Sequence, residues 1–279
     1  MDYHMSSTSQ SASLLNLVQL YLRHRQLTWE MIKRDVKDRY AGQVFGPLWA
    51  IGHPLFLMAV YVVVFSYIFA MKTGEGHFDF PLDFPAYILS GIIPWMAFQE
   101  TMNKGTSAVT ANADLVKQVV FPLEILPVKG IFSAFLTQGV ATLFLIVYTV
   151  IKFSYIPWTY ILLPILIFFQ FLAMTGVCYI LSSVGAYFRD LKDLVQVFTI
   201  ACFYCIPILY LPNWLPKWFQ FIFYLNPFSY MVWCYQDACF FGRFEHPWAW
   251  PIFFFLSFLT FIVGYRIFYK LKTMFGNVL

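Results

Sequence analysis

Two of the five cysteines, Cys202 and Cys205, stand at the C-x-x-C spacing that occurs in thiol redox and metal sites. Their neighbours are apolar and no His or acidic residue lies nearby, so we interpret both as small buried side chains on one helix. The sequence has no phosphate-binding G-x-x-x-x-G-K-[ST] loop, no H-E-x-x-H and no G-x-S-x-G motif. We therefore expect no catalytic residue, no metal site and no cofactor bound by this chain itself.

A second group of residues could do chemistry only if the fold brought them together. It consists of His77, Asp79, Asp83, Asp237 and Glu245. Carboxylates and imidazoles are the usual groups of general acid–base catalysis. If these side chains converged at a membrane surface, they would favour a membrane-embedded enzyme such as a lipid-sugar transferase. No motif predicts that convergence, so this hypothesis depends on the three-dimensional arrangement.

The elements that carry these residues are expected to lie in a membrane. Of the 279 residues, 60% are hydrophobic and only 11% are charged, against about 25% charged in a typical soluble domain. The mean hydropathy is +0.67. A soluble protein of this length could not bury so much apolar surface, so lipid is the predicted solvent.

Runs free of Asp, Glu, Lys and Arg locate the membrane-spanning helices, each of which needs about 20 mostly apolar residues. We predict an all-α integral membrane fold, one domain over residues 1–279, with six transmembrane helices at 47–70, 84–102, 125–151, 158–186, 194–211 and 248–268. Between the last two spans, residues 212–243 are interrupted by Asn226-Pro227. We interpret them as two re-entrant half-helices on the outer side, which require surrounding protein or water.

The basic residues predict the orientation, because cytoplasmic loops are enriched in Lys and Arg. With six spans and both termini in the cytoplasm, the 18 Lys and Arg residues concentrate inside, and those left outside are Lys72, Lys152, Lys217 and Arg243. A seventh span would move the basic C-terminal tail outside and fits this rule less well.

The segment before the first span, residues 14–40, predicts an amphipathic helix in the cytoplasmic interface. Its apolar residues recur at helical spacing on one face, namely Trp29, Ile32, Val36 and Tyr40. Gly42 and Gly46 follow at small-xxx-small spacing, which fits either close helix packing or a bend between two helices. Residues 103–122 are mildly polar and predict a short helix on the same side of the membrane.

Four stretches, in order along the chain, carry a family resemblance. They are residues 34–49 (RDVKDRYAGQVFGPLW), 112–127 (NADLVKQVVFPLEILP), 188–191 (FRDL), and 207–210 (PILY) followed by Asn226-Pro227. Together they resemble the permeases of ABC (ATP-binding cassette) type 2 exporters that export polysaccharide, and most closely the O-antigen and teichoic acid branch. Leu123 stands where that branch carries a basic residue, and the tail from Tyr265 to Leu279 matches no pattern of the family.

The resemblance implies a homodimer of this chain with two copies of a separate P-loop ATPase, which would hold ATP and Mg. It implies a bacterial inner-membrane exporter of lipid-linked, O-antigen-like polysaccharide, with export of capsule, teichoic acid or another lipid as alternatives, and no nucleic-acid partner. Contacts with the ATPase are expected from Arg34, Asp35, Lys37, Arg39, Asn112, Lys117, Pro122 and Glu124. The charges before the first span equally fit contacts with anionic lipid headgroups.

Aromatic residues make up 22% of the sequence, which is more than membrane-interface belts require. Aromatic rings can stack on the C–H faces of sugars without fixing one register, which suits a polymer that slides. Under the resemblance, the candidates for a substrate path are Tyr61, Phe65, Tyr204, Tyr210, Phe223, Tyr224 and Tyr230. For each ring taken singly, a lipid-facing position or packing in the interface belt is the simpler explanation.

Overall fold

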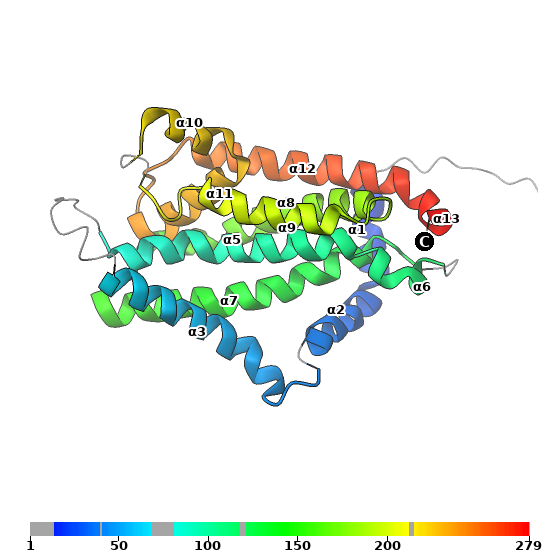
Figure 1. Cartoon of the computed structure of the whole chain (residues 1–279), viewed down its shortest axis with the longest axis horizontal. Helices are drawn as coiled ribbons and strands as arrows, with labels where there is room; N and C mark the ends of the chain where they lie inside the picture. The colour runs from blue at the N-terminus through cyan, green and yellow to red at the C-terminus, as the bar shows by residue number, and fades with distance from the viewer. Residues whose placement is uncertain (1–13, 40, 69–80, 118–120, 212–214, 279) are drawn as a thin grey trace, which may run out of the picture.

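The chain folds into a bundle of long helices. The computed structural model describes residues 14–39, 41–68, 81–117, 121–211 and 215–278, and every regular element in these ranges is a helix. Figure 1 shows four helices side by side and one splayed away from them at one end: α5 (Phe84–Ser107), α7 (Ile125–Phe153), α8 (Leu163–Gly185), α12 (Ala249–Leu271) and the splayed α3 (Trp49–Val63). The predicted all-α fold is confirmed.

Four helical stretches in the described residues are long and apolar enough to cross a membrane: Trp49–Tyr67, Ile125–Phe153, Trp158–Gly185 and Ala249–Met274. They match four of the six predicted spans, although residues 69 and 70 lie outside the described residues. The predicted span 84–102 coincides with α5, whose second half carries Glu100 and Lys104 and is therefore less apolar. The predicted span 194–211 was too long at its end, because α9 (Leu191–Tyr204) has only 14 residues.

The N-terminal segment is two helices, α1 (Leu14–Arg23) and α2 (Arg25–Arg39), rather than the continuous helix predicted for 14–40. The predicted apolar stripe is also divided, since Ile32 is buried whereas Trp29 is 55% exposed. Tyr40 lies outside the described residues. Ile32 is buried because α2 packs on α7, and a position of α2 in the membrane interface stays a prediction.

The two glycines that follow α2 form a bend. Gly42 and Gly46 have φ values of +77° and +47°, and a Cβ at either position would meet nothing within 4 Å. These backbone conformations favour glycine, and the empty surroundings exclude close packing. Of the two interpretations left open for this pair, the bend is the one the structure supports.

The interrupted region after α9 contains the two expected helical pieces, α10 (Lys217–Leu225) and α11 (Pro227–Gln236), and α11 continues into the π-helix Asp237–Phe241. Residues 212–214 lie outside the described residues. The break falls at Asn226-Pro227 because the Asn226 side chain accepts the Phe228 N–H at 3.0 Å and caps α11, whose first residue is Pro227.

Close backbone approach holds the centre of the bundle together. A Cβ on Gly176 of α8 would lie 2.4 Å from the Thr260 carbonyl group of α12, and one on Gly264 would lie 2.1 Å from the Gly176 carbonyl oxygen. At the end of α8, a Cβ on Gly185 would lie 1.9 Å from the Thr106 carbonyl oxygen of α5. Small residues permit such packing between helices, which in lipid relies on van der Waals contact.

A buried polar cluster joins four helices. Gln138 of α7 and Gln170 of α8 exchange hydrogen bonds of 2.9 Å, and Tyr235 of α11 donates to the Gln170 side-chain oxygen. Gln170 also donates to the Pro94 carbonyl of α5 at 3.2 Å. All three side chains are at most 3% exposed, so they satisfy one another in a site that excludes water.

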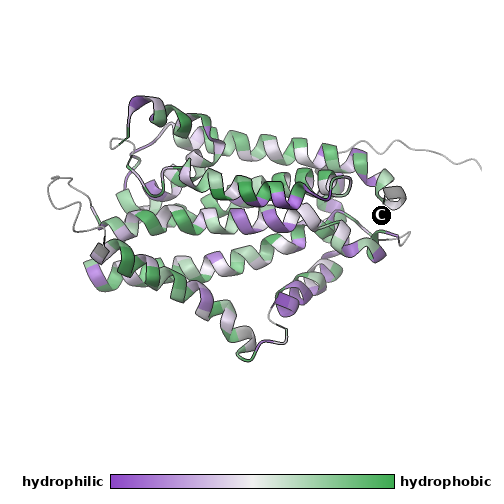
Figure 2. Ribbon diagram, viewed as in Figure 1, coloured by the Kyte–Doolittle hydropathy of each residue, from purple (hydrophilic) through white to green (hydrophobic). Residues whose placement is uncertain are grey.

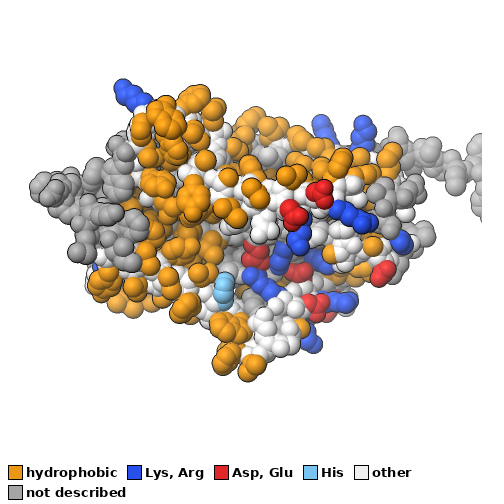
Figure 3. Space-filling model, viewed as in Figure 1, with side chains coloured by type: hydrophobic (Ala, Val, Ile, Leu, Met, Phe, Trp, Pro, Cys, Tyr) orange, Lys and Arg blue, Asp and Glu red, His pale blue; other side chains and the backbone are white. Residues whose placement is uncertain are grey.

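Polar and apolar residues separate along the bundle. Figure 2 shows hydrophilic residues concentrated on α2 and on the adjacent ends of α5 and α9, while the remaining lengths are mostly hydrophobic. In Figure 3, the charged side chains gather over one half of the visible face and the other half is largely apolar. This separation fits a helical bundle with one end outside the hydrocarbon core.

Replacing Gly264 by alanine is expected to destabilise the bundle by about 2 kcal/mol, because the new methyl group would overlap the Gly176 backbone, which cannot move aside without separating two helices. The measurement is thermal unfolding of the purified protein in detergent. Gly139→Ala is the matched control, since a Cβ there meets nothing within 4 Å. Equal midpoints for both variants would contradict the close approach.

Candidate functional site

The end of the bundle that holds α1, α2, α6 (Ala113–Val116) and α13 (Phe275–Val278), here called the charged end, contains an ion-pair network centred on Glu100. Arg39 binds both carboxylate oxygens, at 2.7 and 3.2 Å. Lys104 lies 3.2 Å from Glu100 and 3.4 Å from Asp35. Bidentate ion pairs between arginine and a carboxylate are strong. The network therefore fixes the end of α2 against α5.

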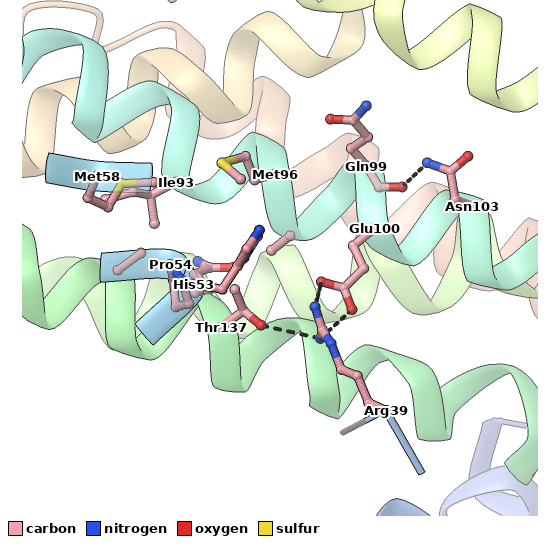
Figure 4. A pocket seen from close by; sticks show the side chains of 13 residues that line it. Arg39, His53, Pro54, Met58, Ile93, Met96, Gln99, Glu100, Asn103 and Thr137 are labelled. Carbon is pink, nitrogen blue, oxygen red and sulfur yellow. Dashed lines mark hydrogen bonds and ion pairs between the residues drawn. The ribbon is translucent and has the colours of Figure 1, made fainter. Parts of the chain in front are cut away.

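A cavity of about 210 Å³ lies beside this network, between α3, α5 and α7. Figure 4 shows Met58, Ile93 and Met96 toward one side of it and Glu100 and Asn103 toward the other. His53 and Pro54 of α3 also line it, with Arg39 at its polar side. Such a wall can hold an amphiphilic molecule, because it offers donors and acceptors beside hydrocarbon contacts.

The residues expected to contact a partner occupy two environments at the charged end. Asp35 and Arg39 belong to the ion-pair network, and Asn112 accepts a hydrogen bond of 2.9 Å from Lys129. The other cations of the set point outward, namely Arg34, Lys37 and Lys117. Arg34 has an 82% exposed side chain and pairs with Asp38 at 3.4 Å.

The last two residues of that set lie where the chain enters α7. Pro122 is half-buried, and the Glu124 carboxylate is 3% exposed and pairs with Lys272 at 2.5 Å. The carbonyl of Glu124 accepts a hydrogen bond of 2.7 Å from the Tyr21 hydroxyl. Desolvation raises the pKa of the Tyr21 phenol, which therefore stays protonated as a donor. Glu124 is thus an internal contact and is not available to a docking surface.

The predicted aromatic set does not form one surface. Tyr61 of α3 and the buried Phe65 of the π-helical turn Val64–Ile68 stack with ring centroids 6.3 Å apart, whereas Tyr204 on α9 is 52% exposed. Phe223 is fully buried and packs on Phe219. Phe223 therefore belongs to the core and presents no face to an open path.

At the opposite end of the bundle, two of the predicted rings, Tyr224 and Tyr230, join a larger aromatic cluster. Tyr224 and Tyr230 lie with ring centroids 5.4 and 5.6 Å from that of Trp233, and Trp248 lies 4.8 Å from Trp233. Tyr210 is half-buried, and its carbonyl accepts a 3.4 Å hydrogen bond from Tyr87. Sequence reasoning missed both tryptophans, although Tyr230 and Trp233 stand three residues apart on one helix face.

The polar residues proposed for an enzymatic site have separate structural partners. Asp83 binds Lys152 and Tyr148, and Glu245 pairs with Arg243 at 2.8 Å. Asp237 is 1% exposed and accepts hydrogen bonds from the His246 N–H at 3.0 Å and from Trp250 at 3.0 Å, with the His246 ring nitrogen 2.9 Å away.

This arrangement does not support an acid–base site among the described residues, whose His, Cys, Asp and Glu form no group able to hold a metal. His77 and Asp79 lie outside the described residues. Cys202 accepts a hydrogen bond from Asn226 at 3.3 Å and is buried, as the sequence predicts, while Cys205 is half-buried.

Residues 26–240 match the membrane-protein family described as ABC-2 type transporter, and the chain belongs to this family. It is 27% identical over 250 residues to a Klebsiella pneumoniae protein named O-antigen export system permease protein RfbA, covering 88% of this chain and 92% of that protein. A Myxococcus xanthus protein of the same name is 26% identical over 71% of this chain and 73% of its own length. The Escherichia coli polysialic acid transport protein KpsM is 21% identical, over 74% of this chain and 78% of that protein.

The Arg39–Glu100 pair should show a coupling free energy of about 1–2 kcal/mol in a double-mutant cycle, because it is bidentate and only partly exposed. The cycle compares Arg39→Ala, Glu100→Gln and the double variant by unfolding in detergent. The exposed Arg34–Asp38 pair is the control, with about 0.3–0.5 kcal/mol expected. Equal coupling in both pairs would show that the network does not fix α2.

Proposed function

We propose that this chain is the transmembrane permease subunit of an ATP-driven exporter that moves lipid-linked, O-antigen-like polysaccharide out of the cytoplasm. The observation that carries the proposal is the alignment along 88% of the chain with a permease named for O-antigen export. The lower identity to KpsM, 21%, makes capsule-type polymer the second candidate substrate within the same family. Teichoic acid, or a lipid of another kind, is a further candidate substrate for the same fold.

The assembly we propose is a homodimer of this chain with two copies of a P-loop ATPase, in a bacterial inner membrane with both termini in the cytoplasm. The sequence supports a separate ATPase, because it has no phosphate-binding loop of its own. ATP and Mg would then be held by that partner, and no cofactor by this chain. The charged end is the proposed cytoplasmic side, in line with the enrichment of Lys and Arg there.

We also propose that α5 crosses the membrane, and that α9 crosses it together with the non-helical residues 205–211 that follow, which gives six spans in one domain. The polar second half of α5 then faces the interior of the assembly rather than lipid, where Glu100 and Gln99 are tolerated. In the same arrangement, α10 and α11 form the re-entrant pair on the outer side. Protein contacts support this, since Phe223 and Trp233 are buried at 0% and 1% exposure.

The cavity between α3, α5 and α7 is the proposed entrance for substrate, and the aromatic cluster around Trp233 is the proposed exit. The entrance places hydroxyl-binding groups of Arg39, Glu100 and Asn103 beside Met58 and Met96. The polar groups suit the sugar and the methionine side chains suit the lipid of a lipid-linked sugar. The exit offers rings that can stack on sugar faces, with Tyr224 46% exposed. Tyr61 and Tyr204 are the proposed contacts between them.

The outward cations Arg34, Lys37 and Lys117 are the proposed contacts for the ATPase, because their charges are free of the ion-pair network around Glu100. A motion of the partner would reach α5 through Asp35 and Arg39, and α7 through Asn112 and Pro122.

Deleting the gene should remove polysaccharide from the cell surface while polymer accumulates in the cytoplasm, as judged by gel and immunoblot of separated fractions. Loss of polymer from both fractions would point to synthesis instead. An unchanged profile would refute the substrate assignment.

Filling the cavity should block export without removing the protein. Met96→Trp, at a half-buried position in the cavity wall, is expected to lower surface polysaccharide at least about tenfold, because a bulky indole occupies the space a ligand needs. The control is Leu143→Trp on α7, at a 61% exposed position outside the cavity. Comparable export by the two variants, at equal protein abundance, would remove the cavity from the path.

A further inference from the structure

The C-terminal tail, which matches no pattern of the resembling family, folds back onto the charged end. After α12, residues Lys272–Met274 form a short 3-10 helix and Phe275–Val278 form α13. Phe275 is fully buried, and its ring centroid lies 5.5 Å from that of Phe268. It also lies 6.3 Å from the ring of Tyr187, at the end of α8. A tail with such contacts belongs to the folded body of the protein.

Three elements that are distant in the sequence meet at Glu124, the residue just before α7. Lys272 of the tail binds its carboxylate at 2.5 Å, and Tyr21 of α1 binds its carbonyl at 2.7 Å. The Tyr179 hydroxyl of α8 lies 2.8 Å from the Tyr21 oxygen and 3.3 Å from the same carbonyl. The Lys272 ammonium also lies 4.2 Å from the centre of the Tyr269 ring.

The residues around Glu124 form a hydrophobic core of their own, separate from the large core of the bundle. Its buried members come from α1, α6, α7, α8, α12, α13 and the turns beside them: Leu17, Val109, Val116, Leu126, Val128, Tyr179, Ala186, Tyr265, Phe268 and Phe275. Val116 is the last residue of the short helix α6, just before the exposed Lys117, and Val109 precedes the 3-10 turn Thr110–Asn112 that leads into α6. A displacement of that helix therefore acts directly on the core that holds the tail.

We propose that Lys272 is a positioning residue for coupling: its ion pair with Glu124 joins the tail and α12 to the segment 121–124 at the start of α7, so that a motion imposed there moves α7 and α12 together. This inference rests on the proposed function, in which that segment receives the motion of the ATPase. Without the pair, the segment would still be attached to α7 by the chain, but its connection to α12 would depend on apolar contacts alone.

The geometry favours this role over simple anchoring of the tail. Phe275 already anchors the tail by burial, and an ion pair adds little to that. The pair fixes one position of the tail relative to Glu124, because separating a buried carboxylate from its cation is costly. Apolar contacts alone would allow the two surfaces to shift relative to each other. The exposed Lys270, two residues earlier, shows that a basic tail residue need not be paired this way.

The test compares Lys272→Met and Lys272→Arg with the control Lys270→Met in the complex purified with its ATPase partner. Hydrogen exchange is measured with and without a non-hydrolysable ATP analogue. In the wild type, the analogue should change exchange in residues 113–117 and 272–276 together. Lys272→Met should keep the change in the first segment and lose it in the second, while Lys272→Arg and Lys270→Met should behave as the wild type.

The second measurement is the ratio of polysaccharide exported to ATP hydrolysed. Both quantities are first normalised to the amount of complex. Lys272→Met should lower this ratio at least about fivefold, a size typical of a lost coupling free energy. Glu124→Gln should do the same, and the double variant should be no worse than either single one. An unchanged ratio, or a loss explained by lower abundance of the complex, would overturn the coupling role.

The two proposals can fail separately. If the deletion strain keeps a normal polysaccharide profile, the proposed substrate is wrong, and hydrogen exchange still decides the role of Lys272 because it needs no polymer. If the wild-type chain restores export and Lys272→Met leaves the exchange response of 272–276 intact, the inference about the tail is wrong and the proposed function stands.

Discussion

A hydrocarbon solvent offers no hydrogen bonds, and this constraint shapes the rest of the protein. A polar group at depth has no water to bind, and Gln138, Gln170 and Tyr235 bind one another across three helices instead. In lipid, burying apolar side chains gives little hydrophobic driving force, so the helices associate through close van der Waals contact instead. The backbones at Gly176 and Gly264 meet for that reason, and α8 and α12 form a fixed centre.

At the charged end, ionic groups take part in holding the helices together, in contrast to the apolar part of the bundle. There the same cations serve two purposes according to their exposure. Arg39 and Lys104 are partly enclosed and join α2 to α5 through Glu100, whereas Arg34 and Lys117 stay at the surface. Enclosed charges define positions and exposed charges remain available to a partner, so one basic segment can both hold its own helix and contact another protein.

The candidate site was only partly predictable. The sequence indicated Asp35, Arg39 and Glu124, because charges at the ends of apolar helices are few and conspicuous. It did not indicate their partners, because Glu100 and Lys272 lie 61 and 148 residues away along the chain. The aromatic set shows the same limit, since composition cannot separate the buried Phe223 from the exposed Tyr204.

The sequence by itself determined the all-helical fold, four of its long apolar helices, the break at Asn226-Pro227 and the absence of a phosphate-binding loop, because hydropathy, proline and local motifs act over a few residues. Tertiary structure decided that the N-terminal segment is two helices and that α9 ends at Tyr204. It also decided where the tail lies. Each of these depends on contacts between segments far apart in the chain, and such contacts leave no periodic signal in the sequence.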